Sequence, residues 1–266
     1  MLTENRKPIW AAMLSLLDHV RTQLAEASTR LSFDRHNELD RAYLSLYLTA
    51  LGYAEEIAIL VQRGTVFSVP LIVRSMLECF VDMRNLQVSP DYATAMRARA
   101  VRAQCSMLEY AKKGGNPYLN GDGHSLADID ATEWHSQREA LAHVKVPRQK
   151  RDLFKNVDMI NEYESIYAHL SEHVHNGLSA LTNRHTEIGV DDFTLTNRLP
   201  VSDEPMLDSY LVHATGLLLS TAMIVFEKYA ISDISIVTAL DAQYQAVLKE
   251  AVRGPEGEGE TGDDTD

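Results

Sequence analysis

Residues 71–81 read Leu-Ile-Val-Arg-Ser-Met-Leu-Glu-Cys-Phe-Val, and they indicate the architecture of the whole chain. Apolar side chains surround this stretch on nearly all sides when it forms a helix, which is typical of a helix at the centre of a bundle. Arg74 and Glu78 lie one turn apart on a single face of that helix. Because an isolated buried charge is very costly, we expect the two side chains to bond to each other and to further polar groups. The pair either fixes the register of the helix, or it presents Arg74 to a pocket as a contact for an anion or a transition state, with Glu78 orienting it.

A second polar stretch, residues 167–175, reads Tyr-Ala-His-Leu-Ser-Glu-His-Val-His. Ser171 and His175 are four residues apart, so they share one flank of the predicted helix. His169 and His173 have the same spacing and lie on the opposite flank. On a straight helix the two pairs of side chains therefore cannot act as one site.

Face-to-face packing of the two helices would gather five polar residues into one buried cluster. These five are the candidate catalytic residues of the chain: Arg74, Glu78, Tyr167, Ser171 and His175. In an active site, His175 would act as a general acid or base and Arg74 would stabilise developing charge. In a structural role, the same residues would form a satisfied hydrogen-bond network that pins two helices together. A hydrolytic triad is disfavoured, because a serine in the middle of a helix is poorly exposed and lacks the sharp turn of a nucleophile elbow.

Neither a metal nor a cofactor is predicted from these residues. The spacing of His169 and His173 is compatible with a zinc ligand pair. The glutamate that follows the first histidine in the zincin motif is missing, however, and no third ligand is evident in the sequence. Exposed or packing histidines are the simpler interpretation of this pair.

Helical periodicity predicts an all-α protein, because apolar residues recur at three- and four-residue spacing over most of the chain. We expect helices over residues 8–27, 37–62, 67–88, 91–113, a segment that begins near residue 152, 204–229 and 232–252. Together they predict a single helical bundle of about six to seven helices. This bundle domain is expected to cover residues 1–253.

Three segments depart from the helical pattern. Residues 114–151 are polar and begin with Gly-Gly-Asn-Pro, which predicts a loop-rich insertion. Residues 185–200 look extended and are compatible with a small β-hairpin. Residues 254–266 are acidic and carry no apolar residue, so they predict a disordered tail.

The charge of the chain limits its partners. The formal net charge is −13, and the tail carries six acidic residues and no basic one, which leaves −7 for the rest. This argues against a protein that coats nucleic acid, and no DNA partner is predicted. Two groups of basic residues are compatible with a local groove, although solvated helix faces are the simpler explanation. The first group is Arg97, Arg99 and Arg102, and the second is Arg148, Lys150, Arg151 and Lys155.

A cytoplasmic location is expected. The two cysteines, Cys79 and Cys105, lie in helical patterns and predict buried thiols in a reducing compartment. The polar residues 1–8 lack the apolar run of a secretory signal. The longest charge-free stretch, residues 209–226, falls short of the roughly 20 apolar residues that span a bilayer, so we expect a buried helix and no membrane partner.

The order of three motifs resembles a widespread bacterial all-α family of unknown function. The motifs are Leu60-x-x-x-Gly64, Arg74-Ser75-x-x-Glu78 and Tyr167-x-x-Leu170-Ser171-x-x-x-His175. In that family an R-S-x-x-E helix and a Y-x-x-x-S-x-x-x-H helix recur. The resemblance covers residues 37–180 and implies an all-α domain.

The architecture is also similar to the HEPN superfamily (higher eukaryotes and prokaryotes nucleotide-binding), whose helical bundles are common in toxin and anti-phage defence systems. Many members are metal-independent ribonucleases, in which a catalytic arginine and histidine lie close together in one motif and are usually paired across a dimer. Here positions 169–171 are His, Leu and Ser, so the arginine would come from Arg74 on another helix. The resemblance implies a homodimer and an RNA partner.

Three functions remain open on the sequence alone. The first is a non-enzymatic helical module that binds a small anionic ligand or a partner protein. The second is a defence- or stress-linked HEPN-like endoribonuclease. The third is a metal-dependent enzyme that uses histidines together with Glu78.

Overall fold

The computed structural model describes residues 9–114, 118–121, 124–147, 149–175, 177–178, 181–182, 186–188, 193–195 and 206–253. The chain divides into two compact units: unit 1 comprises residues 1–83 and 161–266, and unit 2 comprises residues 84–160. Helices dominate the described residues of both units, which confirms the predicted all-α class. The tail at residues 254–266, predicted to be disordered, lies outside the described residues.

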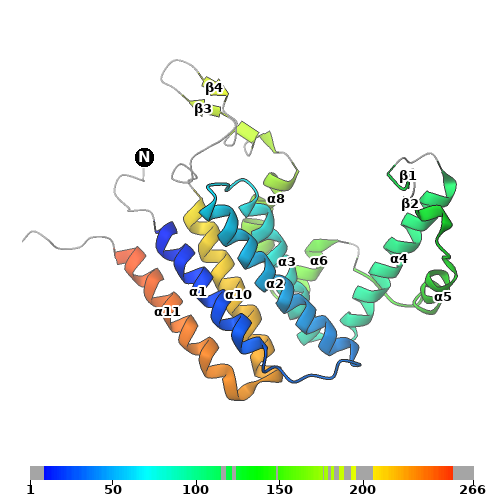
Figure 1. The fold of residues 1–266 in the computed structure, drawn as a ribbon, viewed down its shortest axis with the longest axis horizontal. Coiled ribbons are helices and arrows are strands. Elements are labelled where there is room, and N and C mark those ends of the chain that lie inside the picture. The colour runs from blue at the N-terminus through cyan, green and yellow to red at the C-terminus, as the bar shows by residue number, and fades with distance from the viewer. Residues whose placement is uncertain are drawn as a thin grey trace, which may run out of the picture. The chain divides into compact units, whose positions relative to one another are not determined.

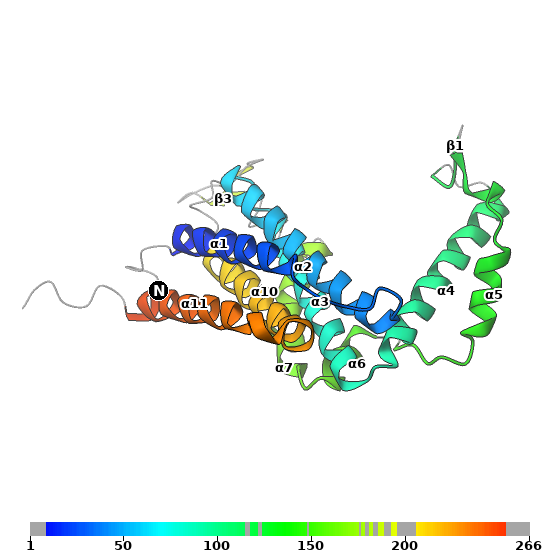
Figure 2. The same ribbon diagram turned by 60° about the horizontal axis from the view of Figure 1, so that its bottom comes forward.

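Four long helices run side by side in unit 1 (Figure 1). They are α1 (Trp10–Ser28), α2 (Glu38–Gln62), α10 (Leu207–Tyr229) and α11 (Ile234–Arg253). Helix α10 contacts each of the other three, as a turned view also shows (Figure 2). This central position follows from its sequence, because apolar residues cover α10 on nearly all sides instead of forming one stripe.

The core of unit 1 contains aliphatic side chains and a buried tyrosine whose hydroxyl is hydrogen-bonded. Helix α1 presents one buried face of residues spaced three or four apart: Met13, Leu17, Val20 and Leu24. Tyr47 of α2 is fully buried, and its ring meets the Phe226 ring edge-on with centroids 6.2 Å apart. The Tyr47 hydroxyl donates to the Leu24 carbonyl at 3.2 Å and lies 2.9 Å from the Ser28 hydroxyl. The ring therefore fills the core while its polar end keeps hydrogen-bond partners.

The chain passes from unit 1 into unit 2 within helix α3 (Val69–Val88) and returns through a continuous helical segment. That segment consists of α7 (Ile160–Glu162), a π-helical turn η2 (Tyr163–Tyr167) and α8 (Ala168–Val174). Beyond it, β3 (Thr186–Ile188) pairs antiparallel with β4 (Phe193–Leu195), inside the segment expected to be extended.

Unit 2 contains more helix than the predicted loop-rich insertion at 114–151. Its elements are α4 (Tyr92–Lys113), the strand pair β1 (Asn120–Gly121) and β2 (His124–Ser125), the short 3-10 helix η1 (Leu126–Asp128), α5 (Thr132–Ala140) and α6 (Lys150–Asn156). Trp134, Leu141, Val144 and Val146 cover the apolar face of α4 formed by Ala98, Val101 and Cys105. This small core explains why the polar segment folds, and why the described helices outnumber the six to seven expected.

Hydrogen bonds tie α5 and the segment after it to helix α4. Arg102 donates to the carbonyls of Leu141 and Val144, at 3.3 and 2.8 Å. The thiol of Cys105 donates to the Trp134 carbonyl at 3.3 Å. Cys79 and Cys105 form no disulfide, as expected; Cys105 is buried as predicted, whereas Cys79 is only half-buried. Arg102, one of the basic residues noted in the sequence, therefore has a structural role in unit 2.

Two helices, α2 and α10, are long and apolar enough to cross a membrane by length and composition. Within the apolar window of α10, 61% of the residues are buried inside the protein, and the corresponding share for α2 is 44%. Core helices of soluble proteins meet the same criterion, and the contacts of α10 with three neighbours fit a core helix.

Candidate functional site

Arg74, Glu78 and Tyr167 form a network of hydrogen bonds. Nη2 of Arg74 donates to the Tyr167 hydroxyl at 2.7 Å, and that hydroxyl donates to Oε1 of Glu78 at 3.0 Å. The same Nη2 lies 3.3 Å from Oε1 of Glu78, which completes the ion pair expected within α3. The guanidinium carbon also lies 4.9 Å from the centroid of the Tyr167 ring, within cation–π range. The prediction that the charged pair bonds internally and recruits a further polar group is confirmed.

The network is largely withdrawn from solvent. The side chains of Arg74 and Glu78 are 18% and 25% exposed, and Tyr167 is buried. Burial is the main cause that raises the pKa of the Tyr167 phenol; the hydrogen bond from Arg74 lowers it, and the neighbouring Glu78 carboxylate raises it. The phenol therefore keeps its proton and can donate to Glu78. Nε of Arg74 is buried without a hydrogen-bond partner among the described residues.

Tyr167 reaches the network from an unusual backbone. It is the last residue of the π-helical turn η2, where one extra residue is accommodated in the helix. The rings of Tyr163 and Tyr167 stack across this turn, with centroids 5.2 Å apart and planes 19° apart. A π turn changes the angular position of all later residues of the helix, so side chains on either side of Tyr167 do not share the faces of a regular α-helix.

The other two candidate catalytic residues have different surroundings. The Ser171 hydroxyl donates to the Tyr167 carbonyl at 2.7 Å, one turn back along the same helix. His175 comes directly after the last residue of α8 and is exposed, while its backbone N–H donates to the Ser171 carbonyl at 3.0 Å. Arg74, Glu78 and Tyr167 thus meet through their side chains, whereas the Ser171 hydroxyl bonds to the backbone and His175 lies at the exposed helix end. A catalytic role for these five residues stays a prediction.

His169 and His173 converge on a residue that sequence reasoning missed. Nε2 of each histidine lies 3.2 Å from the hydroxyl oxygen of Tyr210 in α10. The two imidazole rings meet edge-on with centroids 5.4 Å apart. Tyr210 is 1% exposed. The only feature of the sequence that points to Tyr210 is that it is a polar aromatic residue within the long charge-free stretch 209–226.

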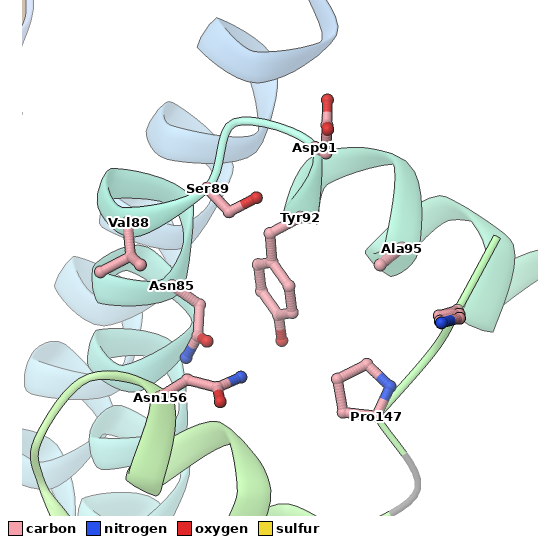
Figure 3. A pocket seen from close by; sticks show the side chains of 9 residues that line it. Asn85, Val88, Ser89, Asp91, Tyr92, Ala95, Pro147 and Asn156 are labelled. Carbon is pink, nitrogen blue, oxygen red and sulfur yellow. The ribbon is translucent and has the colours of Figure 1, made fainter.

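Unit 2 contains a polar pocket of about 310 Å³. Figure 3 shows the amides of Asn85 and Asn156 and the hydroxyl of Tyr92 pointing toward one another. Nine residues line it: Asn85, Val88, Ser89, Asp91, Tyr92, Ala95, Lys145, Pro147 and Asn156. A second cavity of about 500 Å³ shares Asp91, Ala95 and Lys145 with it, so the two adjoin.

The polar groups at the base of this pocket are held in place from within unit 2. Asn85 is buried, and its Nδ2 donates to the Leu153 carbonyl at 3.0 Å. The Tyr92 hydroxyl accepts a hydrogen bond from Nη2 of Arg99 at 3.1 Å. Sequence reasoning missed the pocket because its residues come from both ends of unit 2, and no spacing pattern relates them.

Comparison with protein families gives a match over residues 40–192, to a family described as "Family of unknown function (DUF5677)". The chain belongs to this family. The expected membership in a family of unknown function is thereby confirmed, over nearly the residues predicted. None of the curated proteins and none of the solved structures compared matches the chain.

The DUF5677 match contains the Arg74–Glu78–Tyr167 network and the pocket of unit 2, but it does not contain Tyr210. Arg74, Glu78 and Tyr167 lie inside residues 40–192, as does the whole of unit 2. Helices α1, α10 and α11 lie outside it, and with them Tyr210. The family match therefore covers the network and pocket, whereas the contact of His169 and His173 with Tyr210 joins a family segment to an outer helix.

Substitution Arg74→Ala is expected to lower the free energy of unfolding by about 3 kcal/mol, because it leaves the Glu78 carboxylate in a largely buried site without its cation. The double variant with Glu78→Ala should recover part of this loss. Urea unfolding of the three proteins measures both effects.

Arg21→Ala is the matched control, since Arg21 pairs with Asp18 at 2.9 Å in a more exposed place, with side chains 23% and 46% exposed. Its loss should cost under about 1 kcal/mol. Equal effects of Arg74→Ala and Arg21→Ala would contradict a structural role for the network.

Proposed function

We propose that this protein is a non-enzymatic helical binding module, and that a small phosphorylated, hydroxyl-bearing ligand occupies the pocket of unit 2. The observation that carries the proposal is the pocket itself. It gathers two carboxamides, a phenol, a carboxylate and an amine around a volume suited to a small metabolite.

The lining groups complement such a ligand. The Lys145 amine can pair with a phosphate, while Asp91 accepts hydrogen bonds from hydroxyl groups. The amides of Asn85 and Asn156 both donate and accept. Pro147 adds an apolar wall against which a ring can lie. Each polar function of the ligand therefore has a partner of matching chemistry.

The charge distribution supports an anion. Residues 84–160 hold twelve Lys and Arg against nine Asp and Glu, a formal net charge of +3, although the whole chain carries −13. The basic groups noted in the sequence all fall within this unit. A locally positive unit raises the concentration of anionic ligands near its surface.

The geometry of the network supports binding over catalysis at the predicted catalytic residues. The Arg74 guanidinium is already bonded to a phenol and a carboxylate, which reduces what it can offer an incoming anion. The Ser171 hydroxyl donates its proton to a backbone carbonyl. His175 lies exposed at the end of α8. These contacts favour an architectural role for Arg74, Glu78 and Tyr167.

A thermal-shift experiment tests the binding proposal with three probes: ribose 5-phosphate, glucose 6-phosphate and adenosine monophosphate. Their unphosphorylated parents ribose, glucose and adenosine serve as comparison. At least one phosphorylated probe should raise the unfolding midpoint, since a ligand at 100 times its Kd adds about 2.7 kcal/mol of stability. Its parent should raise it less.

Asn156→Leu should abolish the shift, because it replaces an amide of the pocket lining that can hydrogen-bond the ligand with an apolar side chain of similar shape. Gln149→Leu is the matched control, because Gln149 is an exposed amide of the same unit that does not line the pocket. A shift that persists in Asn156→Leu, or the absence of any shift, would contradict the proposal.

The alternative function is a HEPN-like, metal-independent endoribonuclease of a defence system, acting as a cytoplasmic homodimer. The exposed position of His175 favours it, because an RNA phosphate could reach that imidazole. Under this alternative, the wild type cleaves total RNA or tRNA in the presence of EDTA and a folded His175→Ala variant does not. Under the binding proposal, neither protein cleaves RNA.

A metal-dependent enzyme built on Glu78 has less support. Glu78 accepts a hydrogen bond from Tyr167 and pairs with Arg74. Among the residues that the structure describes, no three His, Cys, Asp or Glu side chains gather in a way that could hold a metal ion.

A further inference from the structure

We infer that His169, His173 and Tyr210 form a site for a divalent transition-metal ion of the zinc type, separate from the pocket of unit 2. Two imidazoles from successive turns of α8 point their Nε2 atoms at one phenol oxygen of α10, each at 3.2 Å. All three residues belong to unit 1.

The distances suit tetrahedral coordination. Metal–ligand bonds of 2.0–2.1 Å at the tetrahedral angle place neighbouring ligand atoms about 3.3 Å apart. Both Nε2-to-oxygen distances are 3.2 Å, close to that spacing. The spacing of four residues along a helix is one that zinc sites use for paired histidines.

Without a metal ion, the two histidines must have different hydrogen-bonding roles toward the Tyr210 hydroxyl. The Tyr210 hydroxyl has one proton, so it can donate to only one imidazole, and the other ring must then donate its own Nε2–H. A bound cation would replace both of these hydrogen bonds. Both rings carry their proton on Nδ1 and give the Nε2 lone pair to the ion, and the phenol releases its proton to solvent as its oxygen bonds to the metal.

Burial and access also fit an ion. Tyr210 is 1% exposed, and a phenolate there is costly unless a cation lies beside it. His169 is exposed, which gives an ion a path to the site and leaves room for water as a fourth ligand. A set of two nitrogens and one anionic oxygen suits Zn²⁺ and Co²⁺ better than Mg²⁺ or Ca²⁺, which prefer oxygen ligands.

The sequence offered no third ligand for this pair because that ligand is a tyrosine, 37 residues from His173. Tyrosine is a less common zinc ligand than His, Cys, Asp or Glu, and among the described residues those four types form no cluster of three that could hold an ion. With an open fourth position, the site should bind more weakly than a closed structural zinc site.

Titration of the full-length protein with Co²⁺ tests the proposal, because tetrahedral Co²⁺ gives intense visible bands and Zn²⁺ should displace them. One equivalent should bind with such bands, together with a near-ultraviolet change from phenolate formation. His169→Ala and His173→Ala should each weaken binding about tenfold or more, since each removes a ligand. Tyr210→Phe keeps the ring in the core and should remove the phenolate signal.

His175→Ala is the matched control, an exposed histidine at the end of the same helix, and it should bind Co²⁺ like the wild type. Circular dichroism verifies that each variant is folded. Absence of tetrahedral bands would overturn the proposal, and so would an equal loss in His169→Ala and His175→Ala. Neither result depends on the pocket of unit 2, so this site and the proposed function fail separately.

Discussion

The hydrogen bonds among Arg74, Tyr167 and Glu78 join the helix by which the chain leaves unit 1 to the segment by which it returns. They join residues 93 and 89 positions apart in the chain. Arg74 lies in the helix through which the chain passes toward unit 2, and Tyr167 lies in the segment through which it returns. Three side chains thus hold together the two ends of an excursion of 77 residues, 84–160.

This arrangement also explains why the polar residues of unit 1 need not be catalytic. A largely buried guanidinium, a buried phenol and a carboxylate are each costly alone, and the hydrogen bonds and ion pair among them offset part of that cost. The side chains proposed to bind a ligand or a metal ion lie elsewhere. They are the amides and charges of the pocket in unit 2 and the imidazoles that share the Tyr210 hydroxyl.

Helical spacing and the cost of buried charge made part of the site predictable from the sequence. The pairing of Arg74 with Glu78 needs only a regular helix, and the expected face-to-face packing of the two polar helices brings Tyr167 to that pair. The exposure of His175 could not be derived from its spacing, because α8 ends at Val174 and His175 follows at the helix end instead of within the helix. Tyr210 and the pocket depend on tertiary contacts between segments far apart in the chain, which periodicity does not encode. The helix content of residues 114–151 was underestimated for a similar reason, since a few scattered apolar residues are enough to cover one face of α4.

The protonation state of Tyr167 is the sharpest test of the link between Arg74 and Glu78. Carbon-13 NMR of the tyrosine Cζ atoms follows each phenol through its titration, and comparison with the spectrum of Tyr167→Phe assigns the resonance. Because burial raises the pKa of this phenol, Tyr167 should remain protonated above pH 10, where an ordinary tyrosine is half ionised. Because the Glu78 carboxylate raises this pKa, Tyr167 should titrate at a lower pH in Glu78→Gln, and an unchanged titration in that variant would contradict the link.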